Sequence, residues 1–167
     1  AYNIIPQRRG KIFIVGDSRV EGVKTTAYRT IAIALGEFLG NRAPKIYSLG
    51  IASQVQSAML TTQLPVAVGQ KATNQKNIII SLSAVNDFIA SAQTSAQSLE
   101  NTKVNAAYVK ANGMLFVAFS ELSTTTTTNS ANSRVSEYRA LILDDNSWAD
   151  GVINTSAVSY AMNPSDT

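Results

Sequence analysis

Histidine and cysteine are both absent from this sequence of 167 residues. Without cysteine, the chain cannot form a disulfide, use a thiolate as a nucleophile or bind a metal through sulfur. Without histidine, it lacks the most common general base and the most common metal ligand of proteins. These two absences exclude thiol chemistry and any metal site built on cysteine or histidine ligands.

Charge is also scarce. Charged residues make up 15% of the chain and the net charge is only +3, whereas about a quarter of an ordinary soluble domain is charged. The one basic cluster, Arg8, Arg9 and Lys11, has no aromatic platform beside it, so we expect no nucleic-acid partner. No apolar run is long enough to span a membrane. The polar but uncharged composition favours an extracellular or virion-surface location over the cytoplasm.

Strand and helix patterns alternate five times along the chain, which predicts one α/β domain over residues 1–167. We expect a three-layer, doubly wound, flavodoxin-like fold with a five-stranded parallel sheet of order 2-1-3-4-5. The expected strands are Lys11–Val15, Lys45–Leu49, Asn77–Leu82, Met114–Phe119 and Gly151–Asn154. The apolar faces expected for the helices between them are Ala27, Ile31, Ala34, Leu35 and Phe38; Val55 and Met59, after a Ser53 cap and before Pro65; Leu99, Val104, Tyr108 and Ala111; and Val135, Tyr138, Leu141 and Ile142.

In a sheet of this kind, ligands bind beyond the carboxyl ends of the strands. Three candidate residues stand there: Ser18 after the first strand, Gly50 after the second and Asn86 after the third. A serine at such a turn can act as a nucleophile, and Asn86 can donate its side-chain amide to an oxyanion. Taken singly, Ser18 and either Asn86 or Asp87 are more typical of helix caps, and Gly50 is typical of an ordinary loop glycine. Because the three strands are expected to be neighbours, the three groups are predicted to converge.

These motifs resemble those of the SGNH (GDSL) hydrolase family. The first block is similar to Ile12–Ser18, the second to Leu49-Gly50, and the third to Ile80–Asp87, where Ala84 replaces the usual glycine. The resemblance covers roughly residues 11–155. It implies a serine esterase that needs no cofactor, with Ser18 as nucleophile and with the Ser18 N–H, the Gly50 N–H and the Asn86 amide as oxyanion donors.

The family also carries an Asp-x-x-His element after its last strand, and this chain has no histidine to match it. Three explanations stay open. The first is that the element lies downstream of these residues; Asp166 is then either its aspartate or an ordinary surface residue. The second is that the histidine comes from another chain or a cleaved piece. The third is that the domain only binds. The resemblance implies a substrate that carries acetyl or other small acyl groups on a carbohydrate. The threonine-rich segment Thr124–Thr128 is expected to border its pocket.

Two rival functions belong to other classes. The first is a catalytically inactive binding or structural module of a surface or virion assembly, which the missing histidine favours. The second is a flavodoxin-like nucleotide or flavin binder. A glycine-rich phosphate loop would have to follow the first strand for that function, and Gly16-Asp17-Ser18-Arg19 does not provide one.

Overall fold

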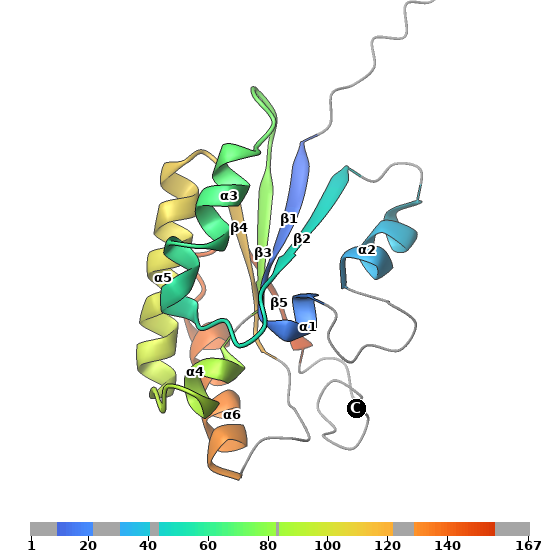
Figure 1. The fold of residues 1–167 in the computed structure, drawn as a ribbon. Helices are drawn as coiled ribbons and strands as arrows, with labels where there is room; N and C mark the ends of the chain where they lie inside the picture. Colours follow the sequence, from blue (N-terminus) through green and yellow to red (C-terminus); the bar gives the residue numbers. More distant parts are fainter. Residues whose placement is uncertain (1–9, 22–30, 41–43, 83, 122–128, 156–167) are drawn as a thin grey trace, which may run out of the picture.

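A single parallel sheet forms the centre of the molecule (Figure 1). The computed structural model describes residues 10–21, 31–40, 44–82, 84–121 and 129–155. The strand order is β2-β1-β3-β4-β5, and every pairing is parallel, as the sequence predicted. The strands are β1 (Lys11–Gly16), β2 (Lys45–Gly50), β3 (Ile78–Leu82), β4 (Leu115–Phe119) and β5 (Gly151–Ile153).

Helices cover both faces of this sheet. They are α1 (Ser18–Glu21), α2 (Ile31–Leu39), the 3₁₀ helix η3 (Gln56–Leu60), α3 (Gln63–Gly69), α4 (Val85–Ile89), α5 (Ser95–Ala111) and α6 (Asn129–Asp144). Because parallel connections are right-handed, the reversal of direction at β1 places α1 and α2 on one face and α3, α5 and α6 on the other. None of the helices described is long and apolar enough to cross a membrane.

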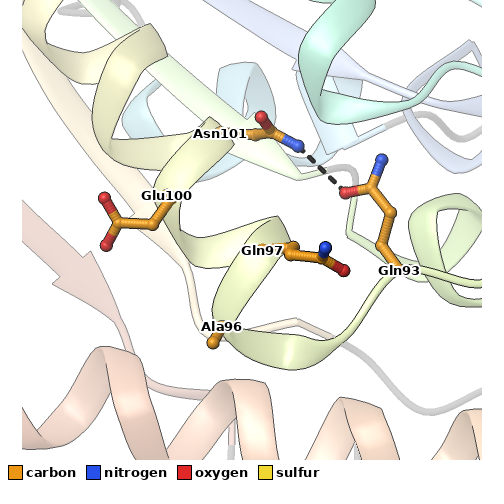
Figure 2. Close-up of a pocket in the computed structure, with 5 residues that line it drawn as sticks. All are labelled: Gln93, Ala96, Gln97, Glu100 and Asn101. Atoms are coloured by element: carbon orange, nitrogen blue, oxygen red, sulfur yellow. Dashed lines mark hydrogen bonds between the residues drawn. The ribbon is translucent and has the colours of Figure 1, made fainter.

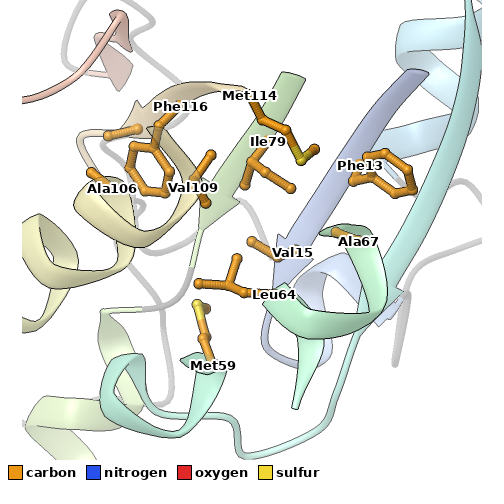
Figure 3. Packing of buried hydrophobic residues seen from close by; sticks show 11 residues of the cluster. Phe13, Val15, Met59, Leu64, Ala67, Ile79, Ala106, Val109, Met114 and Phe116 are labelled. Carbon is orange, nitrogen blue, oxygen red and sulfur yellow. The ribbon is translucent and has the colours of Figure 1, made fainter. Parts of the chain in front are cut away.

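The alternation of side chains along β1 divides the core between the two faces. Phe13 and Val15 pack with Leu64 of α3 and Val109 of α5 (Figure 3). Ile12 and Ile14 instead point to the α1 and α2 side. The central strands are therefore apolar on both sides, which explains why they read as continuous hydrophobic runs in the sequence.

Several details of the helix predictions are wrong. Phe38 and Ala34 of α2 were expected on a buried face, but Phe38 is 86% exposed and Ala34 is exposed as well. On α5, Val104 is 51% exposed and Ala111 is also exposed. Ser53 does not cap the next helix, because the N-cap of η3 is Val55. The helix expected to stop before Pro65 is in fact two elements, η3 and α3, and Pro65 lies in the first turn of α3. Proline is tolerated there because the first N–H groups of a helix have no intrahelical partner. Thr25, Thr26 and Ala27, which were assigned to the second helix, lie outside the described residues.

Candidate active site

The turn after β1 is held by Asp17. Its side chain accepts hydrogen bonds from the backbone N–H and the Nε of Arg19, both to Oδ1 at 2.9 Å. The Asp17 carbonyl oxygen accepts the first helical bonds of α1, from Val20 and Glu21. Asp17 is therefore the N-cap of α1, and the alternative that Ser18 serves as that cap is not what the structure shows. Ser18 becomes the first residue of the helix.

Ser18 is partly exposed at the carboxyl edge of the sheet. Neither its hydroxyl nor its backbone N–H makes a hydrogen bond to any other residue that the structure describes. As the first helical N–H, that amide points toward the space beyond the strand ends. The turn thus presents a hydroxyl and a donor together, which is the arrangement required for a nucleophile that supplies part of its own oxyanion hole.

Asn86 lies in α4, on the loop after β3, the strand that pairs with β1. Asp17 of the serine turn donates its N–H to the carbonyl of Leu82 at the end of β3 (3.4 Å), so the two loops leave the sheet next to each other. The Asn86 side chain donates one hydrogen to the carbonyl of Gln54 at 3.1 Å. An amide nitrogen has two hydrogens, so one is available to a ligand. The α4 N-cap is Ala84, which rules out Asn86 as a helix cap.

Gly50 ends β2 directly opposite Gly16, the last residue of β1. A Cβ at Gly50 would stand 2.0 Å from the backbone nitrogen of Glu21, so only glycine lets α1 approach β2 this closely. Ile51 donates its N–H to the carbonyl of Gly16 at 3.0 Å. Because successive N–H groups of a strand point in opposite directions, the Gly50 N–H points away from β1. Its oxyanion role stays a prediction, whereas its packing role is explicit in the geometry.

Ser53 is a residue at this edge that sequence reasoning did not assign to the site. It occupies a turn closed by Gln54 N–H to the Ile51 carbonyl at 3.1 Å, and its φ is +60°. A serine in the left-handed region is uncommon, and such strain concentrates at functional sites. Its backbone N–H has no partner among the residues described. No signal in the sequence reveals a positive φ at a serine.

Asp87, the residue after Asn86, fixes the Asn86 loop through buried hydrogen bonds. It is fully buried, and its carboxylate accepts hydrogen bonds from the Gln56 backbone N–H at 2.9 Å and from the Ser98 hydroxyl at 2.5 Å. Burial, together with the nearby charges of Glu121 and Asp17, raises the pKa of Asp87 to about 6 despite these two bonds. This residue ties α4 to η3 and α5, so it fixes the base of the loop that carries Asn86.

A cluster of buried charges lies beside the serine turn. The guanidinium of Arg19 forms ion pairs with both Asp17 and Glu121, whose side chains are each only 1% exposed. Glu121 follows β4 and also accepts the backbone N–H of Ala84 at 2.6 Å. The two carboxylates nearest the serine turn therefore already neutralise Arg19. Across the part of the chain described, no three acidic side chains gather closely enough to hold a metal.

The end of β5 completes the edge. Thr155 donates its N–H to the hydroxyl of Ser120 at 3.0 Å and its own hydroxyl to the Glu121 carbonyl at 2.6 Å. These bonds join the strand that ends at Ile153 to the loop after β4. Asp166 and the Thr124–Thr128 segment, both predicted from sequence to contribute here, lie outside the described residues.

Two hollows differ in their relation to these residues. A cavity of about 490 Å³ on α5 is lined by Gln93, Ala96, Gln97, Glu100 and Asn101, with Asn101 bonded to Gln93 (Figure 2). It contains none of the candidate site residues. A second cavity, of about 280 Å³, adjoins the end of β2 and is lined by Ser48, Leu49, Gly50, Ile51, Thr62, Gln63 and Val66. Of the three candidate site residues, this second cavity contains Gly50.

Solved structures of other proteins share this fold. The chain is similar to a lipolytic protein of the G-D-S-L family from Veillonella parvula DSM 2008, with a TM-score of 0.71, 13% identity, and coverage of 87% of this chain and 77% of that one. A putative lipolytic protein of the G-D-S-L family from Desulfitobacterium hafniense DCB-2 gives a TM-score of 0.70 and 15% identity, with coverage of 94% and 82%. The psychrotrophic esterase EstA from Pseudoalteromonas sp. gives 0.64 and 12%, with coverage of 90% and 79%.

No family model matches the sequence, and no curated protein matches it. The likeness to the three solved structures, at 12–15% identity, shows that the chain has the fold of the SGNH (GDSL) hydrolases, as its motifs indicated. In the order of its elements, Ser18, Gly50 and Asn86 follow the first three strands of that fold.

Proposed function

We propose that this chain supplies the nucleophile and the oxyanion donors of an SGNH-type ester hydrolase, and that the base histidine comes from outside residues 1–167. The observation that carries the proposal is the serine turn. The Ser18 hydroxyl stands at the start of α1 with no partner among the described residues, on a turn adjacent to the loop that carries Asn86. The shared fold with G-D-S-L proteins supports it.

In the proposed reaction, the Ser18 oxygen attacks the acyl carbon of an ester while its proton passes to the external histidine. The carbonyl oxygen becomes an oxyanion, held by the Ser18 N–H and the free hydrogen of the Asn86 amide. The family resemblance adds the Gly50 N–H as a third donor, although this N–H points away from β1 in the structure. The alcohol departs with the proton, and water then releases the acyl group from Ser18. No metal or organic cofactor enters these steps.

The state of the nearby carboxylates supports an external base. Asp17 and Glu121 are both ion-paired with Arg19, and the Asp87 carboxylate accepts bonds from Gln56 and Ser98. A general base must be within hydrogen-bond reach of the proton that it accepts, and none of these three groups contacts Ser18. Since the sequence has no histidine, the usual base has to arrive from another segment or chain.

We further propose a small acyl ester as substrate, with acetyl groups on a carbohydrate as the class implied by the family resemblance. The 280 Å³ cavity beside Gly50 suits a small group, and its apolar walls include Ile51, 42% exposed, and Val66, 44% exposed. An extracellular or virion-surface location accords with such a substrate and with the low charge of the chain.

The test is hydrolysis of p-nitrophenyl acetate by the protein purified from its native source. Ser18→Ala should reduce the rate to that of the solution reaction. The matched control is Ser136→Ala, an exposed serine of α6 whose hydroxyl bonds only to Asn132, and it should leave the rate unchanged. Hydrolysis that survives Ser18→Ala contradicts the assignment of the nucleophile.

The source of the base needs a separate experiment. The intact mass of the native protein, with peptide mapping, should reveal a histidine-bearing segment or partner beyond the 17.8 kDa of these residues. The 167-residue chain alone should also gain hydrolysis from added imidazole, measured against Ser18→Ala in the same buffer because imidazole itself cleaves the ester. An identical imidazole response in both proteins argues against a base that acts on Ser18.

A non-catalytic binding module is the second candidate, and the lack of a histidine favours it. In that case the crevice would bind an acylated carbohydrate without cleaving it. Calorimetric binding of an acetylated oligosaccharide, together with no Ser18-dependent hydrolysis in the native preparation, would identify this function.

A further inference from the structure

Glu121 connects the four segments that meet at the carboxyl edge. Its Oε1 forms an ion pair with Arg19, after β1, and its Oε2 accepts the N–H of Ala84, after β3, at 2.6 Å. Its backbone carbonyl accepts Nε of Arg139 in α6 at 2.8 Å and the hydroxyl of Thr155, after β5, at 2.6 Å. No other residue described links the serine turn and the Asn86 loop through one side chain.

Arg19 links Glu121 to Asp17, and Asp17 and Arg19 are the two residues that flank Ser18. Its backbone N–H, Nε and Nη2 all bond to the carboxylate of Asp17, the residue on the other side of Ser18. Asp17 and Arg19 therefore form a closed bracket around Ser18, and Glu121 holds the bracket through Nη1 of Arg19. Through Arg19, the Glu121 carboxylate is therefore connected to the residues on both sides of Ser18.

We propose that Glu121 is a positioning residue of the hydrolytic site: its carboxylate sets the distance between the Ser18 hydroxyl and the Asn86 amide by binding Arg19 with one oxygen and the Ala84 N–H with the other. This inference rests on the proposed function. It assigns a role to a residue that lies 102 positions from Arg19 and 37 from Ala84 in the sequence.

The local conformation of Glu121 supports this role. Its φ is +77°, in the left-handed region that a non-glycine residue adopts only at a cost. The backbone bonds to Arg139 and Thr155 hold it there, and the conformation directs the side chain into the buried space, where it is 1% exposed. A carboxylate buried in this way is tolerated only when its charge is paired and both oxygens are bonded.

Glu121→Gln tests the inference because it conserves shape but not acceptor number. An amide has one acceptor oxygen and one donor nitrogen, so the variant must turn an NH₂ toward either Arg19 or the Ala84 N–H. We expect kcat toward p-nitrophenyl acetate to fall about 10²-fold through misplacement of the reacting groups, while KM changes by no more than about twofold because the substrate is not contacted. Arg19→Lys, which keeps the cation but loses the guanidinium fork, should lower kcat by a smaller factor.

Two controls separate positioning from general destabilisation. Asn77→Ala removes a buried side chain at the opposite edge of the sheet, where it accepts the N–H groups of Lys11 and Ala72. Glu100→Gln removes a surface carboxylate paired with Lys103. Asn77→Ala should lower the melting temperature without changing kcat per folded molecule, and Glu100→Gln should change neither. If Glu121→Gln behaves like Asn77→Ala, the inference is overturned.

Hydrogen–deuterium exchange decides the case independently of catalysis. Glu121→Gln should accelerate exchange in the peptides that cover residues 16–21 and 84–89, whereas Asn77→Ala should not. If the native protein has no Ser18-dependent hydrolysis, the proposed function fails, yet this exchange pattern would still establish that Glu121 couples the two loops. Unchanged exchange in both peptides refutes the coupling, whether or not the protein is an esterase.

Discussion

Asp87 offers a quantitative test of the buried edge. Burial raises its pKa from 3.8 to about 6, so the folded protein holds a proton that the unfolded chain has already released. Stability from this group is therefore full below about pH 4 and falls as the pH rises toward 6. Two pKa units correspond to about 3 kcal/mol in the free energy of unfolding. Above pH 6, the wild type should carry this penalty in full, because the buried group is then charged.

Asp87→Asn removes the titration while keeping the contacts. Its oxygen can accept the Gln56 N–H, and its nitrogen can donate to the Ser98 hydroxyl, which rotates to accept. Urea unfolding, followed by the fluorescence of Trp148, gives the free energy of each protein from pH 4 to pH 8. The difference, wild type minus variant, should fall by about 2 kcal/mol between pH 4 and pH 7, because the unfolded carboxyl is already partly ionised at pH 4. Parallel curves would refute the raised pKa, since the carboxylates that do not interact with Asp87 cancel in the difference.

Two further predictions concern the oxyanion donors. Gly50→Ala forces a Cβ to within 2.0 Å of the Glu21 nitrogen, so α1 must shift, with a loss of about 1–3 kcal/mol in unfolding free energy and a lower kcat; unchanged stability in thermal melts would show that α1 yields freely. Asn86→Ala should lower kcat by about 10²–10³ if its amide binds the oxyanion, and an unchanged rate would leave it only the structural bond to Gln54.

The fold could be predicted because its signals are local. Each expected strand is an apolar run, and the observed bounds differ from the predicted ones by one residue at most, as for β3, which begins at Ile78 rather than Asn77. Gly113 ends α5 at φ +71°, the left-handed position that glycine favours after a helix. The strand order 2-1-3-4-5 was predicted as the order expected for a flavodoxin-like sheet, and right-handed crossovers then determine which face each helix covers.

The errors have tertiary causes. Phe38 belongs to the apolar stripe of α2. The residues of α2 that pack against the sheet are Ile31, Ala32, Leu35 and Leu39. The apolar stripe is therefore wider than the helix face that the sheet covers, and Phe38 lies outside that face. Pro65 reads as a terminator in any helix interior, and only the break between η3 and α3 moves it into a first turn. Periodicity cannot reveal which part of an apolar stripe finds a partner.

Some residues of the candidate site could be identified from the sequence, and others only from the structure. Ser18, Gly50 and Asn86 were identified because each lies at or just beyond the carboxyl end of a predicted strand, and the structure places the ends of those three strands at one edge of the sheet. Ser53 and Glu121 were missed because their significance lies in a positive φ and, for Glu121, in contacts made across the whole sheet. Glu121 lies in the segment Ser120 to Ser123, directly after β4. The only functional signal in this segment is its position at the carboxyl end of a strand.

The buried charges at this edge are better explained by positioning than by stability. Replacing a buried ion cluster such as Asp17–Arg19–Glu121 with apolar side chains is often neutral or stabilising, and the left-handed φ of Glu121 adds a cost of about 1–3 kcal/mol. A chain that needed only a stable core at this edge would gain from neither feature. What both provide is geometry: a fixed bracket around Ser18 and a fixed N–H at Ala84, two residues before Asn86. Departures from local preference of this kind are expected where a structure serves a site.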